Sequence, residues 1–103
     1  MSVQGFNEYV HTLPPSRRGG PKELALEFLK PLGKYQLTMT TRPGRSTVTV
    51  IRDNLEDDSV RAERYVLNFA LVTGGRVVLM DARVAFRCQQ GRGDQRYSAR
   101  LCV

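Results

Sequence analysis

The sequence predicts an α+β fold in which an N-terminal helix packs on a curved antiparallel meander of four long strands plus a short fifth. Two observations carry this prediction. Residues 21–32 repeat their apolar side chains at helical spacing, and two strand-like runs in the segment 60–88 flank a Gly-Gly pair that suits a tight hairpin turn. A helix with one apolar stripe and a sheet with one apolar face cover each other, so both belong to one two-layer core.

The hairpin over residues 60–88 organises the predicted sheet. With Gly74 and Gly75 as its two turn residues, the strands pair in a single register. One face then carries four consecutive apolar or aromatic pairs: Leu71 with Val78, Phe69 with Met80, Leu67 with Ala82, and Tyr65 with Val84. This is the pattern of a half-buried antiparallel ladder, and we expect this face to lie in the core.

The second face of the same hairpin is apolar near the turn and basic at its other end. In this register it carries Arg64, Val66, Asn68, Ala70 and Val72 opposite Val77, Leu79, Asp81, Arg83 and Ala85. Arg64, Arg83 and Arg87 gather at the basic end, with Asp81 and Asn68 close enough to pair. Two interpretations stay open. One is a surface salt-bridge cluster beside a contact with the N-terminal segment, and the other is a surface for a partner or a homodimer.

Residues 1–20 are expected to form a flexible arm, and residues 21–103 a single domain. Glycine and proline punctuate the arm, although Phe6, Tyr9, Val10 and Leu13 have the spacing of a short amphipathic helix that ends before Pro14.

The first firm element is a helix from Pro21 to Leu32. Proline suits the first helical position, and Pro31 with Gly33 ends the helix.

Two shorter alternating runs predict the first hairpin of the sheet. Residues 34–41 place Tyr35, Leu37 and Met39 on one side, and residues 46–52 place Val48 and Val50 on the buried side. Between them lies the turn Arg42-Pro43-Gly44-Arg45, where Pro-Gly suits a type II turn. An acidic loop over 53–59 precedes the long hairpin, and a Gly-rich loop over 89–95 follows it. A short last strand is expected from about 96 to 101.

The chain is basic, with sixteen Lys and Arg against ten acidic residues, a net charge of +6. Such a balance is typical of proteins that contact nucleic acid, an anionic membrane surface or an acidic partner. The basic residues are scattered and no aromatic residues interleave with them as single-strand binding requires. Nucleic-acid binding is therefore the alternative function, and a protein or envelope partner is the favoured one.

Catalytic and metal-binding patterns are missing from the sequence. His11 is the single histidine, and no Gly-x-Ser-x-Gly elbow or Gly-rich phosphate loop occurs. The acidic run over 53–58 lacks the alternating spacing and the glycine of a calcium loop. We expect no enzymatic activity, no cofactor and no metal.

Cys88 and Cys102 are the two cysteines, fourteen positions apart. Their even number, without a Cys-x-x-Cys pair, favours one structural disulfide and hence an oxidising compartment. Closing a loop of this length stabilises a fold by roughly 3 kcal/mol in the chain-entropy model. Two reduced, buried cysteines in the cytosol are the alternative.

Arg92 lies between two glycines in the loop that the disulfide would close. We expect its side chain to fold back and donate hydrogen bonds to loop carbonyls, Asp94 or Asp81, because a long loop needs partners for its carbonyls. The alternative is an outward-pointing fork that binds an anion.

The second half of the chain resembles a group of small bacterial exported proteins, many of them lipoproteins. The resemblance rests on residues 54–64, on Cys88-Gln-Gln-Gly-Arg-Gly, and on Tyr97-Ser98 followed by Cys102. It implies export and a disulfide, and it brings no known activity. This chain departs from the group at Asp94, often a histidine there, and at Tyr97, often a tryptophan. The order of predicted elements is similar to that of cystatin-like and NTF2-like folds, a likeness that carries no function.

These observations together predict a non-enzymatic, extracytoplasmic binding module in the periplasm or cell envelope, stabilised by one disulfide. Residues 1–10 have no apolar segment or cleavage-site pattern. An exported protein of this sequence would therefore have lost its signal peptide and gained Met1. Membrane attachment is expected only through an N-terminal anchor that precedes this sequence.

Overall fold

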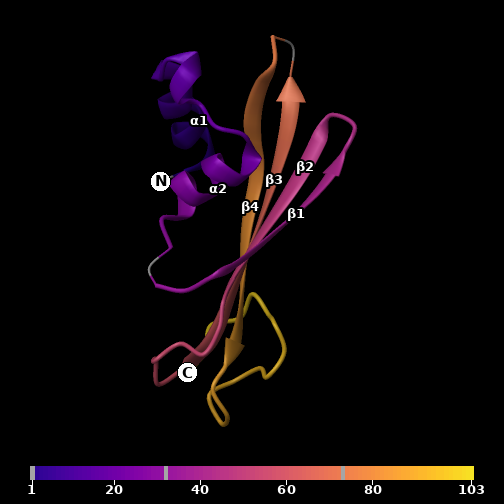
Figure 1. The fold of residues 1–103 in the computed structure, drawn as a ribbon. Coiled ribbons are helices and arrows are strands. Elements are labelled where there is room, and N and C mark those ends of the chain that lie inside the picture. The colour runs from indigo at the N-terminus through magenta and orange to yellow at the C-terminus, as the bar shows by residue number, and fades with distance from the viewer. Residues whose placement is uncertain (1, 32, 73) are drawn as a thin grey trace.

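In the computed structural model, described over residues 2–31, 33–72 and 74–103, helices cover one face of a four-stranded antiparallel sheet (Figure 1). The elements are α1 (Val3–Thr12), the 3-10 turn η1 (Pro15–Arg17), α2 (Pro21–Leu29), β1 (Gln36–Arg42), β2 (Arg45–Arg52), β3 (Val60–Val72) and β4 (Arg76–Cys88). Each strand pairs with its sequence neighbour, in the order β1-β2-β3-β4. This confirms the α+β class and the antiparallel meander.

The molecule is elongated, with extents of 49 × 24 × 22 Å. Its length comes from β3 and β4, which run for thirteen residues each, well beyond the helices (Figure 1). No helix in the described ranges has the length and apolar content needed to cross a membrane.

Helix α1 is part of the core, which corrects the expectation that residues 1–20 form an arm apart from the domain. The Ser2 hydroxyl caps the helix by accepting a hydrogen bond from the Gly5 amide at 3.0 Å. Phe6 and Val10, four residues apart on one face, are buried, and Phe6 packs edge-on against Phe28 with ring centroids 5.1 Å apart. The amphipathic spacing predicted this helix, but nothing local in the sequence shows that β4 provides its packing surface.

Helix α2 begins at Pro21, as predicted, and ends at Leu29. Lys30 follows in the left-handed conformation with φ 45°. The ring of Pro31 disfavours right-handed helical geometry at the residue before it, so the helix stops earlier than the spacing of its apolar residues suggested. The predicted last residue, Leu32, lies outside the described residues.

The core lies between the helices and the middle strands. Its buried members are Phe6, Val10, Leu24, Ala25, Val48, Val50, Leu67, Phe69 and Leu79. Val48 and Val50 face it as predicted, and Leu37 packs at its margin. Met39, predicted to share the side of Leu37, lies on the edge strand β1 and is 39% exposed. Tyr35, predicted on the same side, precedes this strand and is 41% exposed.

The register of the long hairpin agrees with the prediction at one end and departs from it at the other. Tyr65 pairs with Val84 and Leu67 with Ala82, as expected. Nearer the turn, Phe69 pairs with Leu79 instead of Met80, and Leu71 with Val77 instead of Val78.

The departure has two linked causes. Val72 and Arg76 close the turn, so three residues connect the strands instead of two. Gly74 and Gly75 both have positive φ, 88° and 76°, and Thr73 lies outside the described residues. A bulge between Asn68 and Phe69 absorbs the one-residue offset and leaves Met80 as the extra residue of β4. Met80 is consequently 49% exposed, and Leu79 takes the core position at 2%.

The short fifth strand predicted over 96–101 is not formed. The described backbone there makes a single isolated bridge between Ser98 and Phe86. Each of these residues donates its amide to the carbonyl of the other, at 2.9 and 2.7 Å. The bridge ends there because the chain must return to β4, where Cys102 is bonded to Cys88.

Candidate partner-binding face

One face of the sheet is free of helices. Side chains alternate between the two faces of a strand, and α1 and α2 pack on the face that carries Val48, Val50 and Leu67. We call the opposite side the helix-free face. From its edge at β1 to its edge at β4 it carries Thr38, Thr40, Thr47, Thr49, Ile51, Arg64, Val66, Asn68, Asp81, Arg83, Ala85 and Arg87.

A polar chain crosses the middle of the helix-free face. The Thr47 hydroxyl donates to Asn68 Oδ1 at 2.7 Å, and Asn68 Nδ2 donates to Asp81 Oδ1 at 2.8 Å. Asn68 and Asp81 therefore pair with each other, and the salt-bridge cluster with the arginines, one of the two interpretations of this end, is not formed in the described part of the chain. Asp81 is thus part of this row of hydrogen bonds. No basic group in the described ranges lies within 4.0 Å of its carboxylate.

The basic end of this face is built around Tyr97. The guanidinium carbon of Arg64 lies 4.6 Å from the centre of the Tyr97 ring, and that of Arg87 lies 5.6 Å from it. These are cation–π distances, and the ring restricts both flexible arginines to one place. We call these three residues the arginine–tyrosine cluster.

The cluster uses only part of its hydrogen-bonding capacity: Arg87 Nε donates to the Gln95 carbonyl at 3.3 Å. Arg64 is half-buried, and its Nε atom is buried without a hydrogen-bond partner in the described part of the chain. Arg83, directly across from Val66 on the same face, is exposed. None of Arg64, Arg83 and Arg87 has a described carboxylate within 4.0 Å.

Sequence patterning brought Arg64, Arg83 and Arg87 to one end of the face, and the structure places them there. It did not identify Tyr97 as their contact, because Tyr97 reaches the strands only through the fold of the C-terminal loop, residues 89–103. The weak signal available was an aromatic residue inside an otherwise small and polar loop.

The predicted disulfide between Cys88 and Cys102 is present and anchors the C-terminal loop, with Cα atoms 5.5 Å apart. Gly93 lies against it. A Cβ at this position would be 3.0 Å from Cys88 Sγ, and its φ of 135° favours glycine. The loop therefore packs closely on its own disulfide.

The contacts expected of Arg92 are made by another residue. Gln95 Nε2 donates to the carbonyls of Cys88, Gln89 and Gly93 at 3.1–3.3 Å. Arg92 takes part through its backbone: its amide donates to Gln89 and its carbonyl accepts from Val103. Its side chain is exposed, and no described group accepts a hydrogen bond from its guanidinium.

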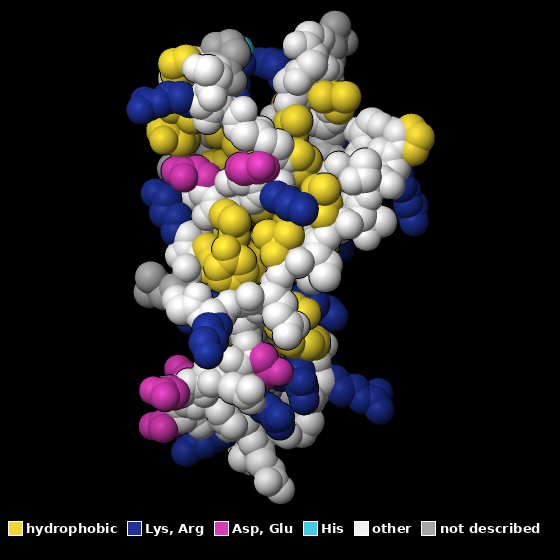
Figure 2. All heavy atoms as spheres, viewed as in Figure 1, with side chains coloured by type: hydrophobic (Ala, Val, Ile, Leu, Met, Phe, Trp, Pro, Cys, Tyr) yellow, Lys and Arg dark blue, Asp and Glu magenta, His cyan; other side chains and the backbone are white. Residues whose placement is uncertain are grey.

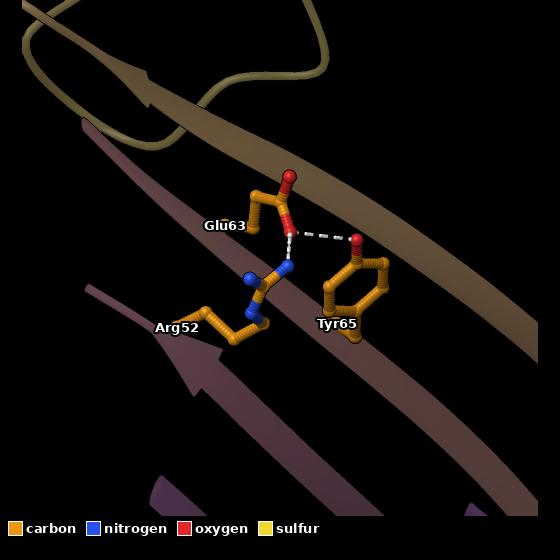
Figure 3. A network of polar contacts seen from close by, with 3 residues as sticks. All are labelled: Arg52, Glu63 and Tyr65. Atoms are coloured by element: carbon orange, nitrogen blue, oxygen red, sulfur yellow. Dashed lines mark hydrogen bonds and ion pairs between the residues drawn. The ribbon is translucent and has the colours of Figure 1, made fainter. Parts of the chain in front are cut away.

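A second polar cluster lies on the opposite face, beyond the helices (Figure 3). Tyr65 donates its hydroxyl proton to Glu63 Oε2 at 2.8 Å, and Arg52 Nη1 lies 3.3 Å from the same oxygen. Burial, followed by this bond to the carboxylate, raises the pKa of Tyr65 to about 12. The sequence analysis did not predict this cluster. The available signal was the opposite charge of Arg52 and Glu63, which pair across the neighbouring strands β2 and β3.

A cleft of about 500 Å³ separates α1 from the tip of the long hairpin. Arg76 donates to His11 Nδ1 across it at 2.9 Å, since arginine offers no acceptor. Arg18 is held at its rim by the carbonyls of His11 and Leu13. These contacts tie the helix end to the hairpin, so we assign the cleft a structural role.

The acidic loop after β2 is ordered by one of its own carboxylates. Asp57 Oδ1 accepts from the amides of Val60 and Ser59 at 2.7 and 2.8 Å, and these bonds lower its pKa. Figure 2 shows acidic side chains at the end of the molecule where this loop lies, beside several basic ones. Asp57 acts here as a turn-forming residue.

No protein-family model, curated protein or solved structure matches this chain.

We expect Gln95, and not Arg92, to stabilise the C-terminal loop. Gln95→Ala removes a donor that three loop carbonyls share, and the Gln89 carbonyl keeps only its bond from the Arg92 amide. We expect a loss of about 1 kcal/mol, which lowers the melting temperature by several degrees in a domain of this size. Arg92→Ala, the matched control in the same loop, leaves the melting temperature within about a degree, as for exposed sites in general. If thermal denaturation shows a larger drop in melting temperature for Arg92→Ala than for Gln95→Ala, then Arg92 is the residue that stabilises the loop.

Tyr65 should make the fold sensitive to alkaline pH. Its pKa of about 12 in the folded protein lies above the ordinary tyrosine pKa of 10.0. The contribution of its neutral form to stability is therefore complete below pH 10 and is lost as the pH rises toward 12. In a spectrophotometric titration of the folded protein, one of the four tyrosines should ionise late. Tyr65→Phe should remove this late step, and its persistence in the variant would refute the assignment.

Proposed function

We propose that this chain is a non-enzymatic binding module that holds an acidic segment of a protein or envelope partner against the basic end of its helix-free face. The observation that carries the proposal is the arginine–tyrosine cluster: two guanidinium groups ordered by one ring, without a described carboxylate within 4.0 Å. A guanidinium fork held in place presents its N–H groups to a carboxylate in bidentate geometry at low entropic cost.

The distribution of charge supports an anionic partner. Residues 60–103 contain eight arginines and three acidic residues, so five of the six net positive charges lie in the hairpin and the C-terminal loop. A field of one sign around a binding site steers an oppositely charged partner to it.

The chemistry of the cluster favours binding over catalysis. Arginine stays protonated throughout the working pH range and does not exchange protons with a substrate. Tyr97 has its ring beside two guanidinium groups. An acidic ligand therefore meets donors from two arginines that the ring holds at this place.

Nucleic-acid binding is the second candidate, favoured by the same charge. We rank it lower because single-strand binders offer free aromatic faces on which bases stack. The ring of Tyr97 is instead in contact with arginine. Self-association through this face of the hairpin also ranks lower, because it would bring two arginine clusters together.

We also propose that the protein works outside the cytoplasm, in the periplasm or cell envelope. The disulfide is compatible with an oxidising compartment, and the resemblance of roughly residues 50–103 to small exported proteins points the same way. The helix-then-meander order is, on this proposal, of the cystatin-like and NTF2-like kind. Alkylation of intact cells before lysis tests the compartment: Cys88 and Cys102 should resist modification until a reductant is added, and free thiols would contradict export.

Binding can be tested with a short glutamate-rich peptide as the probe. We expect it to shift the NMR signals of the Arg64, Arg83 and Arg87 side chains, with an affinity that falls as salt is added. Arg87→Ala should weaken binding about tenfold, the equivalent of one charged hydrogen bond. The control Arg17→Ala removes the same charge from η1 and should change binding far less.

Two results would overturn this proposal. Equal losses for Arg87→Ala and Arg17→Ala would mean that net charge, and not the cluster, attracts the peptide. Stronger binding of a random-sequence DNA duplex, weakened by Arg87→Ala, would establish the nucleic-acid function in place of the acidic partner.

A further inference from the structure

We propose that two copies of this chain associate through β1, edge to edge and antiparallel about Met39, to form one continuous eight-stranded sheet. This goes beyond the proposed function, because it concerns a different edge of the molecule and a different partner. The argument starts from the unequal treatment of the two edges of the sheet.

The edge at β4 is covered by other parts of the same chain. The Asn7 side chain of α1 donates to the Leu79 carbonyl at 2.8 Å and accepts from the Leu79 amide at 3.0 Å. Phe86 exchanges two backbone bonds with Ser98, and the Cys88 amide donates to Asp94. The bulge at Met80 further interrupts this edge. These are devices by which proteins prevent an edge strand from pairing with another chain.

The edge at β1 has none of these devices. Residues 36–42 pair with β2 without a register shift, and the sequence between Gln36 and Thr41 holds no proline and no charge. No described segment other than β2 makes a backbone bond to this strand. The helices pack mainly on β2 and β4.

The backbone groups of this edge are placed to accept a strand. Arg42 and Arg45 close a two-residue turn, so this pair and every second pair beyond it are hydrogen-bonded to β2. The amides and carbonyls of Leu37, Met39 and Thr41 therefore point away from β2. They are the donors and acceptors that a further strand requires.

A second copy of β1 fits these groups. With a two-fold axis at Met39, Leu37 lies opposite Thr41 of the second copy and Met39 opposite Met39 of the second copy. On the other face, Thr38 lies opposite Thr40 of the second copy, a pair favoured in antiparallel sheets. The charged residue Arg42 lies opposite the neutral Gln36 of the second copy. No like charges face each other across this pairing.

This geometry leaves the proposed partner site accessible. An axis perpendicular to the sheet keeps both helix-free faces on one side of the dimer. The two arginine–tyrosine clusters lie on β3, β4 and the C-terminal loop, away from the β1 junction, so the dimer would present two copies of the site to one partner.

The association can be measured by sedimentation over a range of concentrations. The mass should rise from 11.6 kDa toward twice that value. Hydrogen exchange should slow at the amides of Leu37, Met39 and Thr41 over the same range. A mass that stays at 11.6 kDa up to the solubility limit would overturn the proposal, as would a dimer without protection of these amides.

Two matched variants locate the junction. Met39→Lys places two ammonium groups opposite each other at the axis and should abolish the dimer. Met80→Lys makes the same change at an exposed methionine of β4 and should leave the dimer intact. Circular dichroism shows that each variant is folded. A dimer that survives Met39→Lys, or that is lost equally in both variants, contradicts pairing through β1.

Discussion

The structure depends on the way β3 and β4 change register halfway along their length. A one-residue bulge at Met80 allows a three-residue turn at one end of the hairpin while the pairing at the other end keeps its own register. Nearer the turn, the shift turns Leu79 into the core, where Phe6, Val48 and Leu67 complete the cluster beneath the helices. Farther along, it leaves Asp81, Arg83 and Arg87 on the helix-free face. One hairpin thereby serves as the core at one end and as a surface at the other.

The same hairpin fixes the position of everything attached to it. Asn7 binds the backbone of Leu79, so the helical layer is tied to the bulged part of β4. At the opposite end, the disulfide and the bridge from Ser98 to Phe86 bring Tyr97 over Arg64 and Arg87. The candidate site exists because these two attachments lie at opposite ends of β4, leaving the face between them free.

Local pattern predicted α2 and the four long strands, and long-range contacts decided what it missed or placed wrongly, including the fifth strand that is not formed. The helix at Pro21, the burial of Val48 and Val50, and the Cys88–Cys102 bond follow from spacing, alternation and cysteine number, all of which are local or countable. The bulge at Met80 is different, because a methionine and a leucine fit the core side of a strand equally well. The three-residue turn and the packing of α1 place Leu79 in the core and leave Met80 exposed. Tyr97 and Gln95 were missed for a similar reason: a loop without periodicity reveals its contacts only when folded.

Denaturant unfolding of two variants tests the bulge directly. If β4 is bulged at Met80, Leu79→Ala opens a cavity in the core and lowers the free energy of unfolding by about 2–5 kcal/mol. Met80→Ala then trims a half-exposed side chain and lowers it by less than about 1 kcal/mol. A regular two-residue hairpin would place Met80 opposite Phe69 in the core. A large loss for Met80→Ala with a small one for Leu79→Ala would therefore contradict the register on which this account of the fold rests.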